Sequence, residues 1–247
     1  RLPKVMAEVP LADLRAMTTV APPPRDFEAA VRAPGVSLIA ECKKASPSKG
    51  LLVRDYDPAR LARLYEKGGA RAISVLTDTR HFQGTLEHLR DVRERVRLPV
   101  LRKDFIFHPY QVYEARVAGA DAILLIAAVL GDSDLAELLA LASRLGMAAL
   151  IEVHSAEEVA RVLPLRPRLL GVNNRDLQTF AVDFDTTARL RALIPPEIAV
   201  VGESGLKTAD DVRAMKAAGA DAILVGETLL RSKDIIAATR ALVAAGS

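Results

Sequence analysis

Cysteine and tryptophan are almost missing from this chain of 247 residues, which has one cysteine, Cys42, and no tryptophan. A single cysteine excludes a disulfide within the chain and a cluster of cysteine metal ligands, and it agrees with a reducing compartment. Half of the residues are apolar, so the chain can bury a core without such supports. The only asparagines are Asn173 and Asn174, and this depletion of thermolabile residues leads us to expect a thermophilic source.

Concentrated charge and long hydrophobic runs are absent as well. The net charge is +3 and the basic residues are dispersed, whereas a nucleic-acid surface needs clustered lysine and arginine. The pI of about 9.1 favours small acidic ligands. The longest apolar run, Ala122–Leu130, is shorter than the roughly 20 residues that span a bilayer. The opening RLPKVMAEVP has no apolar signal-like stretch, so we expect a cytoplasmic protein without a nucleic-acid, membrane or obligate protein partner.

The usual motifs for nucleotide cofactors and metals are missing too. The sequence contains no Gly-x-Gly-x-x-Gly fingerprint and no Walker loop; these are the common phosphate-binding signatures. The four histidines lack the spacing of metal ligands, so we expect no metal site and mostly solvated imidazoles. They are His81, His88, His108 and His154.

What the sequence does contain is a regular alternation of apolar runs and helical patterns. Eight short runs begin near Ser37, Ala72, Pro99, Asp121, Ala148, Leu169, Ala199 and Asp221. Segments with a 3.6-residue period lie between them, such as residues 58–65. Near-continuous apolar strands that alternate with helices indicate a parallel sheet covered on both faces. Eight such units predict an α/β protein with a (β/α)8 TIM-barrel fold.

An internal repeat agrees with the barrel. The sequence AGADAIL occurs at Ala118–Leu124 and again at Ala218–Leu224, and a weaker copy occurs at Gly69–Ile73. The glycine in each copy suits the end of a helix, where a positive φ is often required. A reused helix-to-strand turn and a duplicated half-barrel both explain the repeat.

The residues before the first strand fall outside the eightfold pattern. They contain an amphipathic stretch, Leu11–Met17, and a short helical pattern, Asp26–Arg32. We therefore predict a single domain over residues 1–247, in which an N-terminal helical extension, residues 1–36, caps a barrel formed by residues 37–247.

Polar side chains follow the strands at the ends where such barrels carry their active sites. These residues are Glu41, Lys43, Lys103, Glu152, Asn173 and Glu203. Side chains two apart on a strand share a face, so Glu41 and Lys43 point the same way and Cys42 the other. Alternate strands contribute to common layers, and a mixture of lysines and glutamates there separates pKa values as acid–base catalysis requires. A structural ion-pair network is the alternative.

Glycine-containing turns after the last two strands predict a phosphate site. The turns are Ser204–Gly205 and Gly226–Glu227. Glycine lets backbone N–H groups approach an anion, and the loops after strands seven and eight often bind phosphate in this fold. Ser46 and Arg175 can add side-chain donors, while an ordinary turn glycine is the alternative for Gly226.

Six motifs together resemble the indole-3-glycerol phosphate synthase family. They are AECKKASPSKG, LRKDFI, IEVH, GVNNRDL, GESGL and ILVGETLL, in order along the chain. The resemblance covers nearly the whole sequence and implies a carbon–carbon lyase of tryptophan biosynthesis that needs no metal or organic cofactor. Its substrate is 1-(2-carboxyphenylamino)-1-deoxyribulose 5-phosphate, which is closed to indole-3-glycerol phosphate with loss of carbon dioxide and water.

The resemblance also implies roles for the charged residues. Lys103 matches the acid at the ketone oxygen, and Lys43 matches the partner of the substrate carboxylate. An alternative family mechanism exchanges some duties between these two lysines. Glu152 matches the base and Glu41 its catalytic neighbour.

The remaining matches concern binding. Asn173 and Glu203 are implied to orient the substrate hydroxyls and the lysines, and Ser204 to contact the substrate. The implied phosphate contacts are Ser46, Arg175, Gly205, Gly226 and the backbone of Glu227. The implied slot for the anthranilate ring consists of Phe82, Phe105 and Leu124, with ordinary core packing as the alternative for Leu124. Some family members have serine at position 227, so only the backbone donor is expected there.

Two other functions fit a phosphate-binding barrel. A Schiff-base aldolase would use Lys103 or Lys43, but the sixth strand, a common place for such a lysine, carries Asn173. A non-catalytic barrel that binds phosphorylated metabolites would have no need of the acid–base residues. We therefore favour the synthase.

Overall fold

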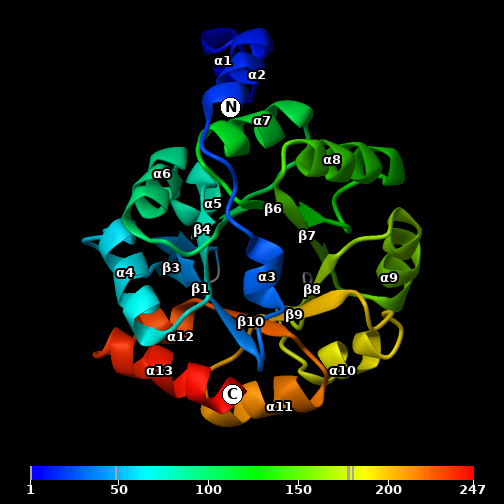
Figure 1. Ribbon diagram of the computed structural model, residues 1–247. Coiled ribbons are helices and arrows are strands. Elements are labelled where there is room, and N and C mark those ends of the chain that lie inside the picture. Colours follow the sequence, from blue (N-terminus) through cyan, green and yellow to red (C-terminus); the bar gives the residue numbers. More distant parts are fainter. Residues whose placement is uncertain (1, 48, 177–178, 180) are drawn as a thin grey trace.

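The computed structural model describes residues 2–47, 49–176, 179 and 181–247. Its centre is a closed barrel of eight parallel strands in the order β1-β10-β9-β8-β7-β6-β5-β4 (Figure 1). The strands are β1 (Ser37–Cys42), β4 (Ala72–Leu76), β5 (Val100–Lys103), β6 (Ala122–Ile126), β7 (Ala148–Val153), β8 (Leu169–Asn173), β9 (Ala199–Glu203) and β10 (Ala222–Val225). The predicted TIM barrel is confirmed, and each strand begins within one residue of its predicted position.

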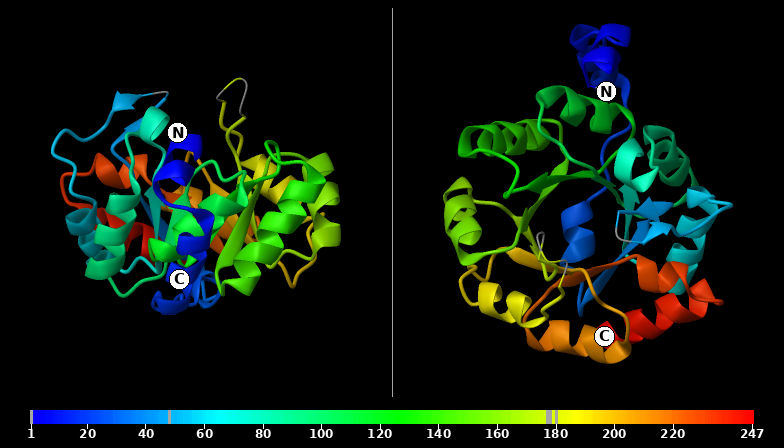
Figure 2. Two further views of the ribbon diagram at one scale, coloured as in Figure 1. Left: turned by 90° about the horizontal axis from the view of Figure 1, so that it is seen from above. Right: turned by 180° about the vertical axis from the view of Figure 1, so that it is seen from behind.

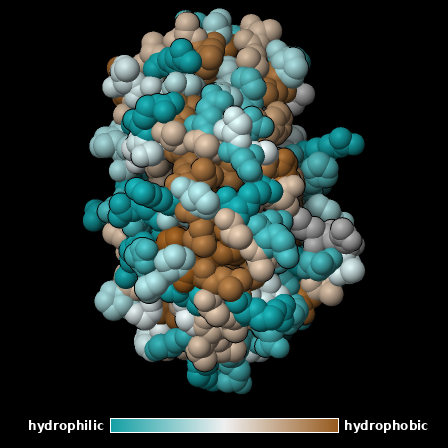
Figure 3. Space-filling view, turned by 90° about the vertical axis from the view of Figure 1, so that its right-hand side faces the viewer, coloured by the Kyte–Doolittle hydropathy of each residue, from teal (hydrophilic) through white to brown (hydrophobic). Residues whose placement is uncertain are grey.

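Helices connect successive strands and form an outer ring. They are α4 (Pro58–Gly68), α6 (Leu86–Arg95), α7 (Pro109–Val117), α8 (Asp132–Arg144), α9 (Ala156–Val162), α10 (Asp185–Arg191), α11 (Ala209–Ala217) and α13 (Ile235–Gly246), with a 3-10 turn η1 (Leu163–Leu165) after α9. Local sequence sets their ends: Asp57 caps α4 by accepting from the Arg60 N–H, and Gly69 ends it with φ of +95°. The side of the barrel with α8 and α9 is largely hydrophilic around a strip of hydrophobic residues (Figure 3).

Alternate residues along each strand face opposite sides of the barrel wall. Ile39, Leu101 and Leu124 belong to the cluster inside the barrel. Cys42 belongs to the cluster between the strands and the helices. Because side chains alternate along a strand, Glu41 has the same inward orientation as Ile39. The predicted parity of the first strand is therefore correct.

The N-terminal extension consists of α1 (Leu2–Glu8), α2 (Leu11–Val20) and α3 (Phe27–Val31). Sequence periodicity predicted α2 and α3 but not α1, which has no buried residue. Phe27 and Val31 of α3 pack into the cluster inside the barrel, at the end away from the loops that follow the strands (Figure 2). Helix α2 packs against α7. The extension thus closes one end of the barrel with apolar side chains.

The AGADAIL repeat has a structural explanation. Gly119 and Gly219 end α7 and α11 with φ of +88° and +80°. The carboxylates of Asp121 and Asp221 then accept hydrogen bonds from Val100 N at 2.7 Å and Val200 N at 2.8 Å on the neighbouring strands. The same turn chemistry is used twice because each aspartate fixes the start of a buried strand.

Short elements surround the other end of the barrel. They are β2 (Ala45–Ser46), β3 (Gly50–Leu51), α5 (Thr79–Phe82) and α12 (Glu227–Leu230). The antiparallel β2–β3 pair and the described residues at the Arg175–Val182 bridge lie at the end opposite α3 (Figure 2). Within the described ranges, no helix has the length and apolar character needed to cross a membrane.

Candidate active site

A cavity of about 960 Å³ opens at the carboxyl ends of the strands, and every site residue predicted from the sequence lines it. These residues come from all eight barrel strands or the loops that follow them, as expected for an active site in this fold. Additional lining residues that the sequence reasoning missed are Lys49, Leu76, Ile126, Phe184, Lys207 and Arg231.

Lys103 is the central cation of the cavity. Its Nζ lies 3.1 Å from Glu152 Oε2 and 2.9 Å from Glu203 Oε2. Lys103 and Glu203 are the last residues of β5 and β9, and Glu152 is the last but one of β7, so alternate strands bring the three into one layer as predicted. Both glutamates are at most 4% exposed. One ammonium group is thus shared by two buried carboxylates.

Lys43 forms a second pair with Glu41, with a distance of 2.5 Å between Lys43 Nζ and Glu41 Oε1. Glu41 is buried and the Lys43 side chain is 17% exposed, so the ammonium group lies nearer the mouth. Lys44 is only half-buried and lines no part of the cavity. The predicted separation of Lys43 from Cys42 is confirmed.

Two glycines make room for the buried carboxylates. A Cβ on Gly226 of the β10–α12 turn would lie 2.5 Å from Glu41 Oε1. A Cβ on Gly171 of β8 would overlap Glu203 Oε1. At both positions a larger residue would force a buried carboxylate to move, which for Gly226 adds a reason beyond the predicted phosphate contact.

Asn173 connects Glu152 with the next strand. Its Nδ2 donates to Glu152 Oε1 at 3.1 Å, and its Oδ1 accepts from Arg175 N at 3.1 Å. The neighbouring Asn174 points outward: its amide nitrogen donates to Glu203 O at 3.0 Å and its Oδ1 accepts from the Thr187 hydroxyl at 2.7 Å. The two asparagines thus align the glutamates from opposite sides of the barrel wall.

The histidines were expected to be mostly solvated, and His154 is an exception. Its side chain is 12% exposed, and Nε2 lies 3.3 Å from Glu152 Oε1. The reason is its place in the chain: His154 directly follows β7, and its ring turns back toward Glu152, the last inward-facing residue of that strand. The motif IEVH contained the signal, but an imidazole in a loop has no parity that predicts its direction.

The pKa values of these groups are displaced in different directions. Burial raises the pKa of Glu203 to about 7, against the opposing effect of Lys103. Burial would also raise the pKa of Glu152, but Lys103, His154 and Asn173 together hold it well below its usual range. Burial would lower the pKa of Lys103, yet the carboxylates of Glu203, Glu152 and Glu41 raise it above its ordinary value. Lys103 thus stays protonated beside two carboxyl groups, Glu152 and Glu203, whose pKa values differ.

The predicted phosphate residues gather at one side of the cavity. Ser204 and Gly205 follow β9 with φ of +70° and +83°, and the Thr228 hydroxyl of α12 donates to Leu206 O at 2.8 Å, which joins the two loops. Glu227 is paired with Arg231 at 2.8 Å. This pair reduces the charge that the Glu227 carboxylate would present to an anion.

The apolar wall lies across the cavity from these loops. Phe82 is half-buried, Phe105 is 40% exposed, and Leu124 is 3% exposed. The rings of His81 and Phe105 meet edge to face with centroids 6.1 Å apart. An exposed phenylalanine beside a cavity is available to cover a flat ligand.

Comparison with known proteins agrees with this geometry. The family profile of indole-3-glycerol phosphate synthase matches residues 1–242. The chain belongs to the indole-3-glycerol phosphate synthase family. A relative with that name from Rhodopirellula baltica is 54% identical over 239 residues, covering 96% of this chain and 92% of the relative. Another from Roseiflexus sp. strain RS-1 is 52% identical over 244 residues, covering 95% and 91%.

Solved structures of low identity share the fold alone. A thiamine phosphate pyrophosphorylase from Pyrococcus furiosus has a TM-score of 0.66 at 17% identity, covering 89% of this chain and 97% of its own. An N-acetylmannosamine-6-phosphate 2-epimerase from Clostridium perfringens has a TM-score of 0.65 at 18% identity, covering 83% and 90%.

Behind the site of this family member, Arg102 anchors the loop that carries Phe105. Its guanidinium is buried on the helix side of β5 and pairs with Asp104 and Glu114, each at 2.9 Å. Asp104 Oδ1 in turn accepts from Phe105 N at 2.8 Å. Asp104 thus fixes the backbone that follows Lys103.

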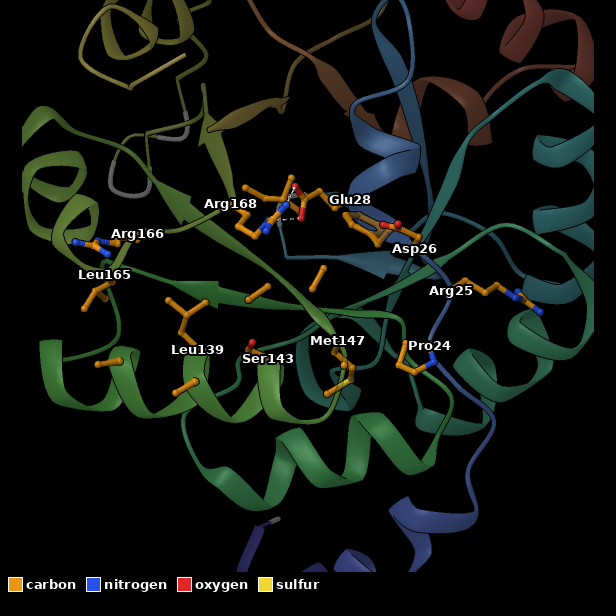
Figure 4. Close-up of a pocket in the computed structure, with 17 residues that line it drawn as sticks. Pro24, Arg25, Asp26, Glu28, Leu139, Ser143, Met147, Leu165, Arg166 and Arg168 are labelled. Atoms are coloured by element: carbon orange, nitrogen blue, oxygen red, sulfur yellow. Dashed lines mark hydrogen bonds and ion pairs between the residues drawn. The ribbon is translucent and has the colours of Figure 1, made fainter. Parts of the chain in front are cut away.

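A second hollow of about 780 Å³ lies at the other end of the barrel, between α3, α8 and the starts of β7 and β8 (Figure 4). None of the predicted site residues lines it. Its Arg168 and Glu28 turn toward one another and pair at 2.6 Å. Across the described part of the chain, no group of three or more His, Cys, Asp or Glu residues is arranged to hold a metal ion.

Proposed function

We propose that this chain is an indole-3-glycerol phosphate synthase that converts 1-(2-carboxyphenylamino)-1-deoxyribulose 5-phosphate to indole-3-glycerol phosphate, carbon dioxide and water. Family membership over nearly the whole chain supports the reaction class, that of a carboxy-lyase. The single observation that carries the mechanism is Lys103 Nζ held between Glu152 and Glu203.

Ring closure needs an acid at the ketone. As the aromatic carbon that bears the carboxylate attacks the ketone carbon, the oxygen becomes basic and accepts a proton. Lys103 is the proton donor, because three carboxylates keep it protonated before substrate binds. Loss of carbon dioxide then restores the aromatic ring and leaves a hydroxyl group on the new five-membered ring.

Dehydration completes the reaction. The hydroxyl leaves as water with a proton from an acid, while a base removes a proton from the five-membered ring. Glu152 is the base, since it is held ionised and lies in the same layer as Lys103. Glu41 assists Glu152 as its catalytic neighbour. Asn173 and Glu203 orient the substrate hydroxyls and the lysines.

Lys43 binds the substrate carboxylate. It lies nearer the mouth than Lys103 and already has an anionic partner in Glu41. A substrate carboxylate can share the Lys43 ammonium group with Glu41, so that the buried Glu41 carboxylate keeps its cation. The exchange of some duties between Lys43 and Lys103 is the alternative assignment within the same function.

The two ends of the substrate suit the two sides of the cavity. The phosphate contacts are Ser46, Arg175, Gly205, Gly226 and the Glu227 backbone, with Ser204 as a further substrate contact. Backbone N–H groups at glycine turns favour such an anion. The anthranilate ring lies against Phe82, Phe105 and Leu124. A cavity of about 960 Å³ is large enough for a ligand of this size.

A Schiff-base aldolase is less well supported. A lysine must lose its proton to attack a carbonyl, whereas the neighbouring carboxylates raise the pKa of Lys103. Incubation with the proposed substrate, followed by indole fluorescence, tests the synthase. No fluorescent product from the purified chain would overturn it, and a borohydride-stable adduct with a phosphorylated ketose would favour the aldolase.

A further inference from the structure

His154 lies between two carboxylates at the edge of the site. Its Nε2 is 3.3 Å from Glu152 Oε1, and its Nδ1 is 3.5 Å from Glu158 Oε2. The imidazole is 12% exposed and does not line the cavity. It therefore contacts the proposed base from behind rather than the substrate.

The start of α9 holds this arrangement in place. The His154 backbone N–H donates to Glu158 Oε2 at 2.7 Å, and the Ser155 hydroxyl accepts from Glu158 N at 3.2 Å. Glu158 is thus bound through its backbone and its side chain in the first turn of the helix. The imidazole therefore lies between Glu158, which is held at the start of α9, and the buried Glu152.

Charged and polar groups from several elements surround Glu152 and His154. Glu152 meets Lys103 of β5 and Asn173 of β8, and Glu203 of β9 lies beyond Lys103. His154 meets Glu152 and Glu158. Arg161 acts on Glu158 from within α9. The His154 imidazole is therefore shared by the carboxylates of Glu152 and Glu158. None of the cations named here contacts the imidazole.

This environment favours the imidazolium. Burial would lower the pKa of His154, but the carboxylates of Glu152 and Glu158 raise it to about 9. Glu152 consequently has two cations: Lys103 on Oε2 and His154 near Oε1.

We propose that His154 is a positioning residue that, held by Glu158, keeps Glu152 ionised during the part of the cycle in which Lys103 has given up its proton. The need follows from the proposed function, on which this inference rests. When Lys103 donates to the ketone oxygen it becomes neutral, and Glu152 loses the charge that stabilised its own. A carboxylate left buried without a cation takes up a proton and can no longer act as a base. A second cation that does not take part in the reaction prevents this.

Kinetics of His154→Gln against the parent test the proposal. Glutamine keeps a polar group of similar reach but carries no charge. We expect kcat to fall about tenfold and the acidic limb of the kcat profile, which reports groups in the enzyme–substrate complex, to move up by about one pH unit. KM should stay within about twofold, because the ring does not contact substrate.

Two variants of α9 form a matched pair. Glu158→Gln should shift the acidic limb in the same direction by a smaller amount, because it weakens the imidazolium. Glu157→Gln, at an exposed position beside it, should leave the profile unchanged. A His154→Gln enzyme that melts at a lower temperature but keeps the parent kcat and pH profile would overturn the proposal and leave His154 a structural contact.

Imidazole NMR separates this inference from the proposed function. In the parent, the ring resonance absent from His154→Gln should titrate about two pH units above an ordinary histidine, whether or not the protein is active. Titration at the ordinary value would overturn the ion pair. An active parent with an unshifted His154→Gln profile would contradict only the inference, whereas an inactive parent with an upshifted histidine would contradict only the synthase assignment.

Discussion

Lys103 Nζ lies 2.9 Å from Glu203 Oε2, at the centre of a cavity floored by residues from alternate strands. The pair joins β5 and β9, which are not neighbours in the barrel. The contact therefore exists only because the sheet closes and aims both strand ends at one point.

Replacing Lys103 should lower kcat much more than it lowers the affinity for substrate. In Lys103→Arg the cation remains, so Glu152 and Glu203 keep a partner, but arginine does not release its proton. We expect kcat to fall about 10³-fold, within the range of a lost general acid. Lys103→Met should abolish turnover and also lower the stability of the protein. Undiminished turnover in either variant, measured by indole fluorescence and compared with substrate binding by calorimetry, would refute the role.

Gly171→Ala should displace Glu203 without touching any charged group. The new Cβ would overlap Glu203 Oε1, so the carboxylate must move away from Lys103. We expect kcat to fall about tenfold or more, since small misplacements of catalytic groups are costly. Gly131→Ala is the control, because its Cβ meets nothing closer than 3.8 Å. Equal activity of the two variants would show that Glu203 needs no such space.

Much of this site followed from the sequence, for identifiable reasons. Strand parity placed Glu41, Lys43 and Cys42, and the AGADAIL turns marked strand starts. His154 was missed because loop side chains have no periodicity, and Arg102 because its partners lie on α7 and in the loop behind the strand. The division at residue 36, the cytoplasmic location and the thermophilic source stay predictions.

Glu203 should make the stability of the protein depend on pH. Burial raises the pKa of Glu203 to about 7, above the value of about 4.3 for an unperturbed glutamate. Between these values the folded state binds more protons than the unfolded state, so this group lowers the free energy of unfolding as pH rises. In Glu203→Gln the side chain does not titrate, so this fall in the free energy of unfolding is absent.

The measurement is urea denaturation of both proteins at pH 5, 6, 7 and 8. We expect the stability of Glu203→Gln relative to the parent to increase by about 2–3 kcal/mol from the lowest to the highest pH. A difference that is constant with pH, or that falls, would contradict the raised pKa.

Lys43→Met should weaken recognition of the substrate carboxylate. It removes the cation at the mouth and leaves Glu41 without its 2.5 Å partner. We expect KM to rise at least tenfold for the substrate. For an analogue without the anthranilate carboxylate, the parent and the variant should bind with affinities within about threefold of each other. Equal loss of affinity for both ligands would assign Lys43 to another part of the substrate.

The most direct measurement of the central claim uses substrate labelled with ¹³C in the anthranilate carboxylate. The purified chain should release one labelled carbon dioxide for each indole-3-glycerol phosphate formed, and Lys103→Arg should release it about 10³-fold more slowly. Product formed with the label retained, or no product from the parent chain, would contradict the account.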